Sequence, residues 1–335
     1  MSMANQTTVT EFILLGLFSD PQLQTFLFLV FLVIYLSTLG GNVAIMLVTR
    51  ADSHLGTPMY FLLSHLSFSD ICFSSVTVPK MLETLLSERK TISVSCCFAQ
   101  MFFLLLSGCS EVFILSAMAY DRYAAICDPL RYMRTMSKRV CSQLVAGAWL
   151  IGSLYALINT LPLLALHFCG PNTINHFSCE LPSLVALSLI KLSCSVTHQM
   201  ELVTFLGSFL FTLPPFLLTL TSYVCIITAI LRISSSTGRQ KAFSTCSSHL
   251  IVVTTFYGTL IIVYILPKTK MLRELNKVFS VFYTILTPLA NPLIYSLRNK
   301  EVMEALRKAV RNSVAGINTQ YIRRLELPYQ VGGQC

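Results

Sequence analysis

The sequence predicts an all-α membrane protein, a bundle of seven transmembrane helices with an extracellular N-terminus and a cytoplasmic C-terminus. Of the 335 residues, 54% are hydrophobic and only 12% are charged, whereas a soluble globular protein carries about 25% charged residues. The hydrophobic residues fall in long blocks, each near or above the roughly 20 residues that a helix needs to cross a bilayer. Lysine and arginine are distributed unevenly between the connecting segments, and this bias sets the orientation.

The seven hydrophobic blocks define the helices in order. The first contains no charged residue, and together they run approximately over Phe26–Val48, Pro58–Val78, Phe98–Tyr120, Val140–Leu166, Leu202–Leu231, Phe243–Leu266 and Val278–Leu297. Seven crossings place the two ends of the chain on opposite sides of the membrane. We therefore expect an N-terminal tail over 1–25, a transmembrane domain over 26–298 and a C-terminal tail over 299–335.

The orientation follows from charge. With the N-terminus outside, 16 of the 24 Lys and Arg residues lie in cytoplasmic segments, and the tail before Phe26 contains none. That tail holds Asn5-Gln6-Thr7, a glycosylation acceptor that functions only outside the cell. The net charge of +9 then reflects topology and contact with anionic membrane lipid, not nucleic-acid binding.

An acid and a base, Asp121 and Arg122, stand side by side where the third block ends. An interfacial charge pair that merely ends the span is one interpretation. Other segments favour a second one. The chain carries, in this order, GN (41–42), TPMYFLLSHLSFSD (57–70), MAYDRYAAICDPLRY (118–132), KAFSTCSSHL (241–250), FYGT (256–259) and TPLANPLIYSLRN (287–299). With these motifs the chain resembles the tetrapod-type (class II) olfactory receptors, a branch of the rhodopsin-like G-protein-coupled receptors.

The resemblance implies a switch at the cytoplasmic end of the bundle. Asp121 would neutralise Arg122 at rest, and activation would free Arg122 to contact a stimulatory, olfactory-type G protein that raises cyclic AMP. Proline removes a backbone hydrogen bond, so Asn291-Pro292 can loosen the seventh helix. The residues implied in this switch are Asp121, Arg122, Tyr123, Tyr223, Asn291, Pro292 and Tyr295.

Two acids, Asp70 and Glu111, lie deep inside predicted spans. Intramembrane carboxyl groups are rare and costly, so we expect a functional role. The resemblance implies that they face each other near Asn42 and Asn291 and hold a sodium ion or water. The alternative is a protonated, hydrogen-bonded structural pair. We expect no other metal and no cofactor.

Cysteines on the outer side can form disulfides, because that compartment is oxidising. The resemblance implies a Cys97–Cys179 bridge and a second one between Cys169 and Cys194, and a swapped pairing with Cys96 stays open. Relative to the family, the loop has about five additional residues near 185–189. This insertion puts the second bridge and the ligand lid in question.

Helical stripes in the outer halves of four helices are the candidate ligand wall. None of these residues is charged, so the wall suits a small, neutral, fairly apolar volatile and not a buried ion. The alternative is that they only pack helix against helix. The candidates are Leu104, Leu105, Gly108, Cys109, Val112, Gly207, Ser208, Phe211, Tyr257, Leu260, Ile261, Tyr264, Val281 and Thr284.

Three other classes of protein fit less well. A transporter would show inverted repeats and broken helices, and an amine receptor would place an acid near Leu104 or Leu105. An enzyme is not expected, because the sequence shows no nucleophile–base pair, metal box or phosphate loop. We expect a multi-pass protein of the plasma membrane, located in the cilia of olfactory neurons.

Overall fold

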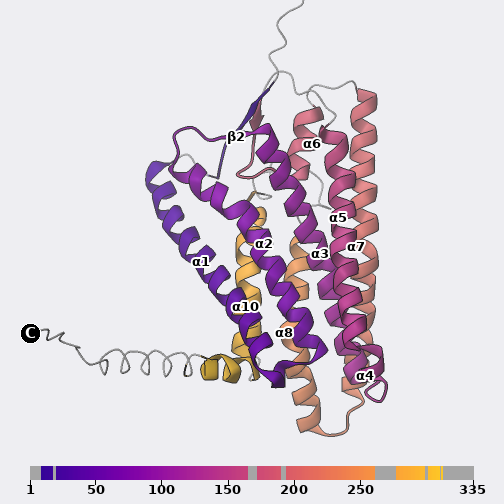
Figure 1. Ribbon diagram of the computed structural model, residues 1–335. Coiled ribbons are helices and arrows are strands. Elements are labelled where there is room, and N and C mark those ends of the chain that lie inside the picture. The colour runs from indigo at the N-terminus through magenta and orange to yellow at the C-terminus, as the bar shows by residue number, and fades with distance from the viewer. Residues whose placement is uncertain are drawn as a thin grey trace, which may run out of the picture.

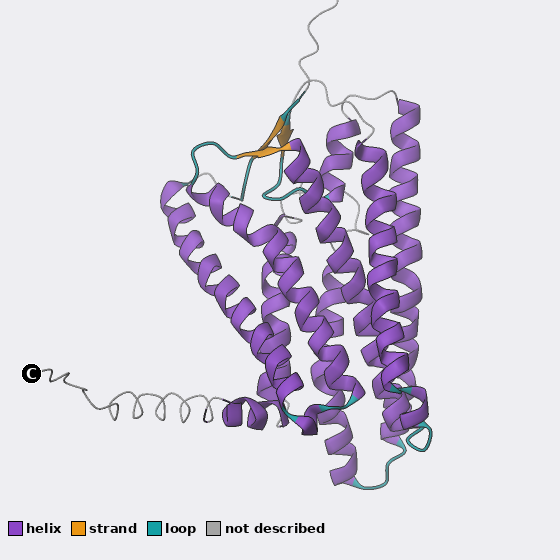
Figure 2. Cartoon of the chain, viewed as in Figure 1, coloured by secondary structure: helices purple, strands orange, loops and turns teal. Residues whose placement is uncertain are grey.

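The structure, a computed structural model, describes residues 9–17, 20–164, 172–189, 194–260, 277–298, 301–309 and 311. Within these ranges, seven long helical segments run side by side in one bundle (Figure 1). Figure 2 shows that the strands gather at one end of the bundle, which we call the sheet end. We call the opposite end, which carries the short helix α4, the α4 end.

The bundle helices follow the predicted order. They are α1 (Pro21–Ala51), α2 (Pro58–Leu86), α3 (Val94–Cys127), α5 (Lys138–Leu164), α7 (Cys194–Leu231), α8 (Ser236–Leu260) and a last segment made of 277–281, the π-helical η3 (Phe282–Leu286) and α10 (Thr287–Arg298). The shorter elements are η1 (Ser53–Leu55), α4 (Tyr132–Thr135) and α6 (Leu181–Leu189), with the strands β1 (Glu11–Leu14), β2 (Thr91–Ser93) and β3 (Thr173–Ile174).

Six of these segments are long and apolar enough to cross a membrane, within the described residues. The exception is α8, which has the length but begins with the polar run Ser236–Lys241. The predicted sixth block, Phe243–Leu266, also continues beyond the described part of this helix. The chain is a multi-pass membrane protein with a seven-helix bundle, as the sequence predicts.

Several helices extend past the predicted blocks. Helix α2 continues through Pro79 to Leu86, and α3 continues to Cys127, so that Asp121 and Arg122 lie inside a helix and not at its end. Helix α1 begins at Pro21, within the predicted tail, where the Asp20 side chain accepts a hydrogen bond from the Gln22 N–H at 2.9 Å. The hydropathy pattern marks the part of a helix that contacts lipid, whereas backbone hydrogen bonding continues beyond it.

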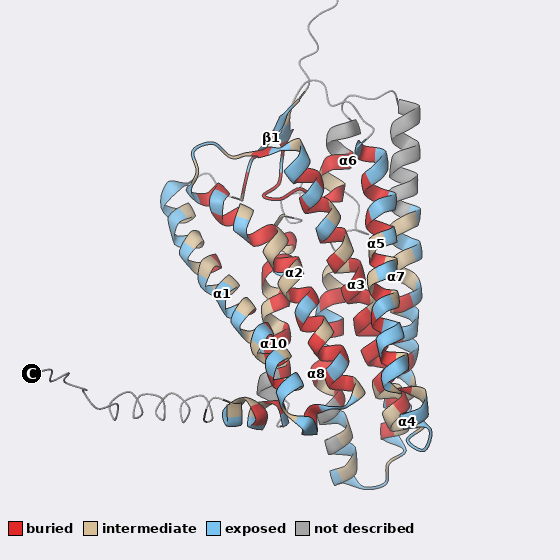
Figure 3. Ribbon diagram, in the orientation of Figure 1, coloured by how far each residue is buried: buried red, intermediate tan, exposed pale blue. Residues whose placement is uncertain are grey.

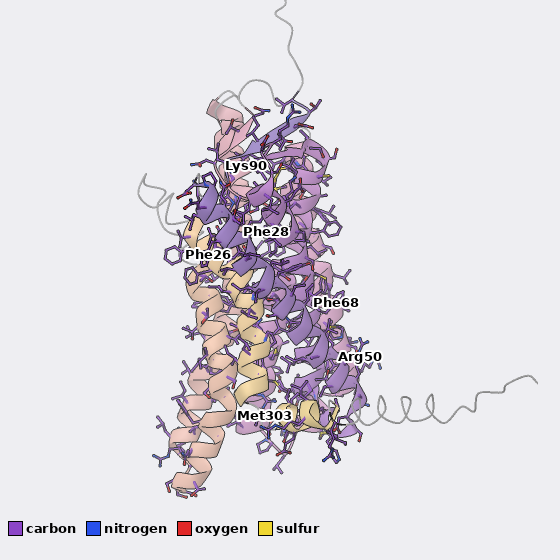
Figure 4. The ribbon with its side chains drawn as sticks, turned by 90° about the vertical axis from the view of Figure 1, so that its left-hand side faces the viewer. Phe26, Phe28, Arg50, Phe68, Lys90 and Met303 are labelled. Atoms are coloured by element: carbon purple, nitrogen blue, oxygen red, sulfur yellow. A yellow bond between two sulfur atoms is a disulfide. The ribbon has the colours of Figure 1, made fainter. Side chains whose placement is uncertain are left out.

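Helix α3 is the central element of the bundle. In its most apolar window 67% of the residues are buried, against 17% in α1, which lies at the edge. Figure 3 shows the same contrast, with buried residues concentrated on α3 and exposed ones along α1. The labelled Phe26 of α1 points away from the bundle (Figure 4), and 62% of it is exposed.

The three strands form a small sheet in the order β2-β1-β3. Strand β1 pairs antiparallel with β2 and parallel with β3, and its side chains alternate, so that Phe12 and Leu14 are fully buried while Ile13 and Leu15 are exposed. The predicted Cys97–Cys179 disulfide is present and ties α3 to the segment before α6. The backbone N–H of Cys179 also donates to Gln100 Oε1 at 2.9 Å. The sheet and this segment form the lid of the bundle.

A helix over 301–309 lies across the α4 end, inside the segment predicted as a tail (Figure 1). Two contacts hold it against the bundle: Lys308 pairs with Asp52 of the first connection at 3.3 Å, and the Tyr60 hydroxyl of α2 donates to Glu301. The His54 backbone N–H and the Lys308 ammonium lower the pKa of Asp52. The labelled Met303 marks this helix in Figure 4.

Candidate signalling and ligand sites

Asp121 and Arg122 form an ion pair at the α4 end of α3. The Arg122 guanidinium donates to Asp121 Oδ2 from Nη2 at 2.7 Å and from Nε at 3.1 Å. Asp121 is fully buried, and only 14% of the Arg122 side chain is exposed. The Tyr132 hydroxyl of α4 donates to the other carboxylate oxygen at 2.8 Å. Burial, together with the Asp121 charge, raises the pKa of Tyr132, so its hydroxyl stays protonated and keeps donating.

Two of the three switch tyrosines, Tyr223 and Tyr295, lie within electrostatic range of Arg122 but have no hydrogen bond to the pair among the described residues. Tyr223 of α7 hydrogen-bonds to His249 Nδ1 of α8, and the two rings stack with centroids 5.8 Å apart. Tyr295 of α10 is buried, and its hydroxyl has no partner among the described residues. Tyr123 packs against the cluster of Ala119, Tyr223, Ile226, Ile230 and Cys246. Helices α3, α7 and α8 are therefore in close contact towards the α4 end.

Near the middle of the bundle, Asp70 and Glu111 are buried within electrostatic range of each other. The Asn291 amide donates to both Asp70 oxygens, at 3.0 and 2.9 Å. Asn42 is turned elsewhere, because its amide donates to the backbone carbonyls of Thr38 and Pro288, each at 3.0 Å. Among the described residues, Glu111 Oε1, Asn291 Oδ1 and Asn42 Oδ1 have no hydrogen-bond partner. Carboxylate and amide oxygens of this kind are the ligands that a hard cation prefers.

Most of the candidate ligand wall is buried, but it divides between three clusters. Leu105, Cys109 and Phe211 belong to a cluster under the lid, whereas Val112, Tyr257 and Leu260 belong to a deeper one. Val281 packs instead with residues of α1 and α2. Ile261 and Tyr264 lie outside the described residues, as does Asn5. The predicted Cys169–Cys194 bridge also lies outside the described residues.

The remaining candidates also differ in what they contact. A Cβ atom at Gly108 would lie 3.2 Å from the Phe73 ring of α2, so this position faces α2. Gly207 lies beside Tyr155, and Ser208 hydrogen-bonds to the Tyr155 hydroxyl at 3.0 Å. Leu104 is buried. Thr284 is fully buried, and its hydroxyl has no partner within the described chain.

A group of hydroxyls joins three helices below the wall; we call it the hydroxyl node. Ser116 Oγ of α3 donates to the Pro215 carbonyl at 2.9 Å and lies 3.0 Å from Thr219 Oγ1, both on α7. The Tyr257 hydroxyl of α8 lies 3.5 Å from the same Ser116 oxygen. The Phe216 ring meets the Tyr257 ring edge to face at 5.2 Å. The hydroxyl node therefore adds polar groups from α3, α7 and α8 next to the apolar candidate wall.

Comparison with known proteins identifies the fold and the family. The family model described as olfactory receptor matches residues 31–313. Human olfactory receptor 9G4 is 51% identical over 93% of this chain and 94% of its own length, and mouse olfactory receptor 5M5 is 49% identical over 94% and 97%. The chain belongs to the olfactory receptor family. Squid rhodopsin aligns with a TM-score of 0.62 at 16% identity over 94% of each chain, and this likeness shows the fold alone.

Family membership settles the broad class of function. The protein is an odorant receptor of the G-protein-coupled type, and members of this family are not enzymes. The sequence prediction of the family and of a non-enzymatic function is therefore confirmed. The ligand type and the G protein are separate questions.

The receptor's lid contains a buried polar cluster that sequence reasoning missed. Glu180 accepts from Ser178 Oγ at 3.2 Å and from Ser280 Oγ at 3.4 Å, and its other neighbour is His176 Nε2 at 3.8 Å. All four residues are buried. Ser280 belongs to the last bundle segment, so the cluster ties the lid to it. The sequence feature that could have indicated this cluster is the run His-Phe-Ser-Cys-Glu around Cys179, which places three of its polar side chains close together.

Three further residues of the receptor went unpredicted. Tyr155 of α5 packs against Phe211 with ring centroids 4.9 Å apart and bonds Ser208. Ser116 forms the hydroxyl node, and no sequence pattern distinguishes it from the other serines of α3. His249 bonds the switch tyrosine Tyr223, and its Nε2 has no hydrogen-bond partner in the described part of the chain.

Replacing Asn291 with alanine should destabilise the receptor by about 1–3 kcal/mol, because the buried Asp70 loses both amide contacts. The melting temperature of the purified full-length receptor in detergent measures this change. Asn159→Ala is the matched control, since within the described residues that buried amide donates only to the Tyr155 carbonyl of its own helix. Equal losses from the two substitutions would contradict a special contribution of the Asp70–Asn291 contact.

Proposed function

We propose that this odorant receptor detects small, neutral, largely apolar volatiles between the lid and the hydroxyl node, and activates a stimulatory, olfactory-type G protein that raises cyclic AMP. The observation that carries the proposal is the hydroxyl node, since it joins α3, α7 and α8 beneath a wall of uncharged side chains. Such a site offers dispersion contacts and a few hydroxyls, and none of the candidate wall residues is charged.

The proposed orientation places the lid outside the cell. The lid carries the disulfide, and disulfides persist in oxidising compartments. The α4 end carries the basic residues Arg131, Arg134, Lys138 and Arg139, which favour the cytoplasmic side. Arg122 then faces the G protein, and Asn5 lies outside, where it can be glycosylated. We further propose the ciliary plasma membrane as the location.

Helix α8 provides the route from ligand to G protein. Tyr257 of the hydroxyl node and His249 of the Tyr223 bond lie on this one helix, eight residues apart, or about 12 Å along its axis. A ligand that draws Tyr257 away from Ser116 moves α8 as a unit. That movement strains the Tyr223–His249 bond and opens the inner end beside Arg122. Only a ligand that binds the open arrangement more tightly can drive this change.

The Asp70 cluster fits a sodium ion in the resting arrangement. Asp70 and Glu111 would supply charge, and the unpartnered oxygens of Glu111 and Asn291 would supply ligands. A bound cation offsets the cost of two buried carboxylates. In its absence, the same pair would be held by protonation and by the Asn291 amide.

A cyclic-AMP reporter assay against a panel of neutral volatiles tests the proposal. Tyr257→Phe keeps the ring and removes the hydroxyl, and it should raise the half-maximal odorant concentration up to about tenfold, the equivalent of one hydrogen bond. Tyr35→Phe is the matched control, because it removes a hydroxyl that bonds Ser75 between α1 and α2. Unchanged potency in Tyr257→Phe, or activation by charged ligands only, would contradict the proposed site.

A further inference from the structure

A groove lies between the ends of α7 and α8, outside the sites described above. Its volume is about 470 Å³, and its lining comes from Ile227, Ile230, Leu231, Ser236, Arg239, Gln240 and Phe243. The four apolar side chains form its walls, and the three polar residues all belong to the first two turns of α8. Figures 1 and 4 show these paired helix ends at the α4 end, where they project beyond the helix that carries Met303.

The apolar walls are accessible from outside the bundle. Ile227, Leu231 and Phe243 are 44%, 65% and 57% exposed. Ile230 is buried against Ala119 and Tyr223 and forms the base of the groove. In a membrane protein, an open apolar wall beside the polar end of a helix lies where an acyl chain meets its headgroup.

The polar end of the groove carries positive charge, and none of its lining residues is acidic. Arg239 Nη2 donates to the Ile233 carbonyl at 3.1 Å, and this bond holds the guanidinium at the mouth of the groove. Among the described residues, no hydrogen-bond acceptor is assigned to its other N–H groups. The segment 202–273 contains no Asp or Glu, and the first turn of α8 contains no acid. The start of α8 adds a positive helix dipole next to Arg239. Charge therefore favours an anionic occupant.

We propose that this groove binds one anionic phospholipid of the surrounding bilayer. The phosphate would contact Arg239 and the start of α8, with Ser236 and Gln240 as further hydrogen-bond donors. One acyl chain would lie along Ile227, Leu231 and Phe243. Because the lipid spans both helices, it would resist the separation of their ends, and its release would accompany the movement of α8.

Native mass spectrometry of the purified full-length receptor tests the proposal, with dioleoylphosphatidylserine and dioleoylphosphatidylcholine as probes. We expect the first phosphatidylserine to bind about fivefold more tightly than phosphatidylcholine, and Arg239→Gln to remove this preference. Arg134→Gln is the matched control, because it removes the same charge from an exposed residue of α4 and should leave the preference intact. Equal losses in the two variants would show diffuse surface attraction and overturn the proposal.

Two further measurements separate the lipid from other occupants. Ile227→Trp fills the groove without changing charge and should weaken phosphatidylserine binding, whereas soluble glycerophosphoserine should not compete for the site. Competition by this headgroup alone would overturn a lipid site in favour of a simple anion site. A photoreactive benzoylphenylalanine at position 243 should label lipid, and labelling only a second receptor copy or a G-protein subunit would also overturn the proposal. The melting temperature of each variant shows that it is folded.

Discussion

Replacing Arg122 with alanine is expected to remove the odorant-dependent rise in cyclic AMP, reducing the response by about 30-fold or more. Loss of one partner from a buried, hydrogen-bonded charge pair costs 2–5 kcal/mol at protein interfaces. Arg122 supplies the only cation hydrogen-bonded to Asp121 within the described residues, through two bonds to one oxygen. The same guanidinium is the group that we propose to meet the G protein once the helix ends separate.

The assay needs a readout of folding, because the substitution also leaves a fully buried carboxylate with Tyr132 as its remaining partner. Staining of an N-terminal tag on intact cells gives the amount of receptor at the surface, and the response is expressed per surface receptor. Arg134→Ala is the matched control, since it removes an exposed arginine from the same end of the bundle. A surface-expressed Arg122→Ala receptor that signals like the wild type would refute the role of Arg122.

The sequence predicted the parts of the fold that a one-dimensional pattern can encode. Hydropathy found the order of the helices, and charge indicated which end carries the basic residues. It placed the end of the third helix at Tyr120, because Asp121 and Arg122 look like an exposed boundary, although the helix continues past both and the structure buries Asp121 fully and Arg122 in large part. The hydropathy pattern also started the sixth helix at Phe243. The polar first turns of α8, which line the groove between α7 and α8, therefore lay outside every predicted element.

Contacts between distant residues account for what was missed. The Glu180–Ser280 bond joins residues 100 positions apart, and the Ser116–Tyr257 contact spans 141 positions. Periodicity places each residue on a face of its own helix, but it does not say which neighbouring helix that face meets. Val281 illustrates the point, since its position on the helix does not reveal that it packs with a cluster that includes residues of α1, α2 and the lid. Pairing of this kind depends on the packing of whole helices.

Glycines give the sharpest example, because two that look alike in the sequence are in different surroundings. Gly147 and Gly152 both lie in α5, and a Cβ atom at Gly147 would have no described heavy atom within 4 Å beyond its chain neighbours and the adjacent backbone of α5. At Gly152, the same atom would lie 2.4 Å from Ser110 Oγ and 2.7 Å from the Leu106 carbonyl oxygen of α3. The Leu106 oxygen belongs to the backbone, so no change of rotamer relieves the overlap. Of the two glycines, Gly152 is therefore the one at which α5 lies closer to α3.

Gly152→Ala is therefore expected to destabilise the receptor by about 1–3 kcal/mol, the usual cost of overpacking a tight interface. Separation of α3 from α5 would also break the bond from Ser110 Oγ to the Ala148 carbonyl at 3.3 Å. Gly147→Ala is the matched control and should stabilise the protein by about 0.4–1 kcal/mol, because alanine restricts the unfolded chain without a clash. The melting temperatures of the two purified variants should thus move in opposite directions. A shift of the same sign in both would mean that α3 and α5 do not pack through Gly152, and the position of α3 as the central helix would need revision.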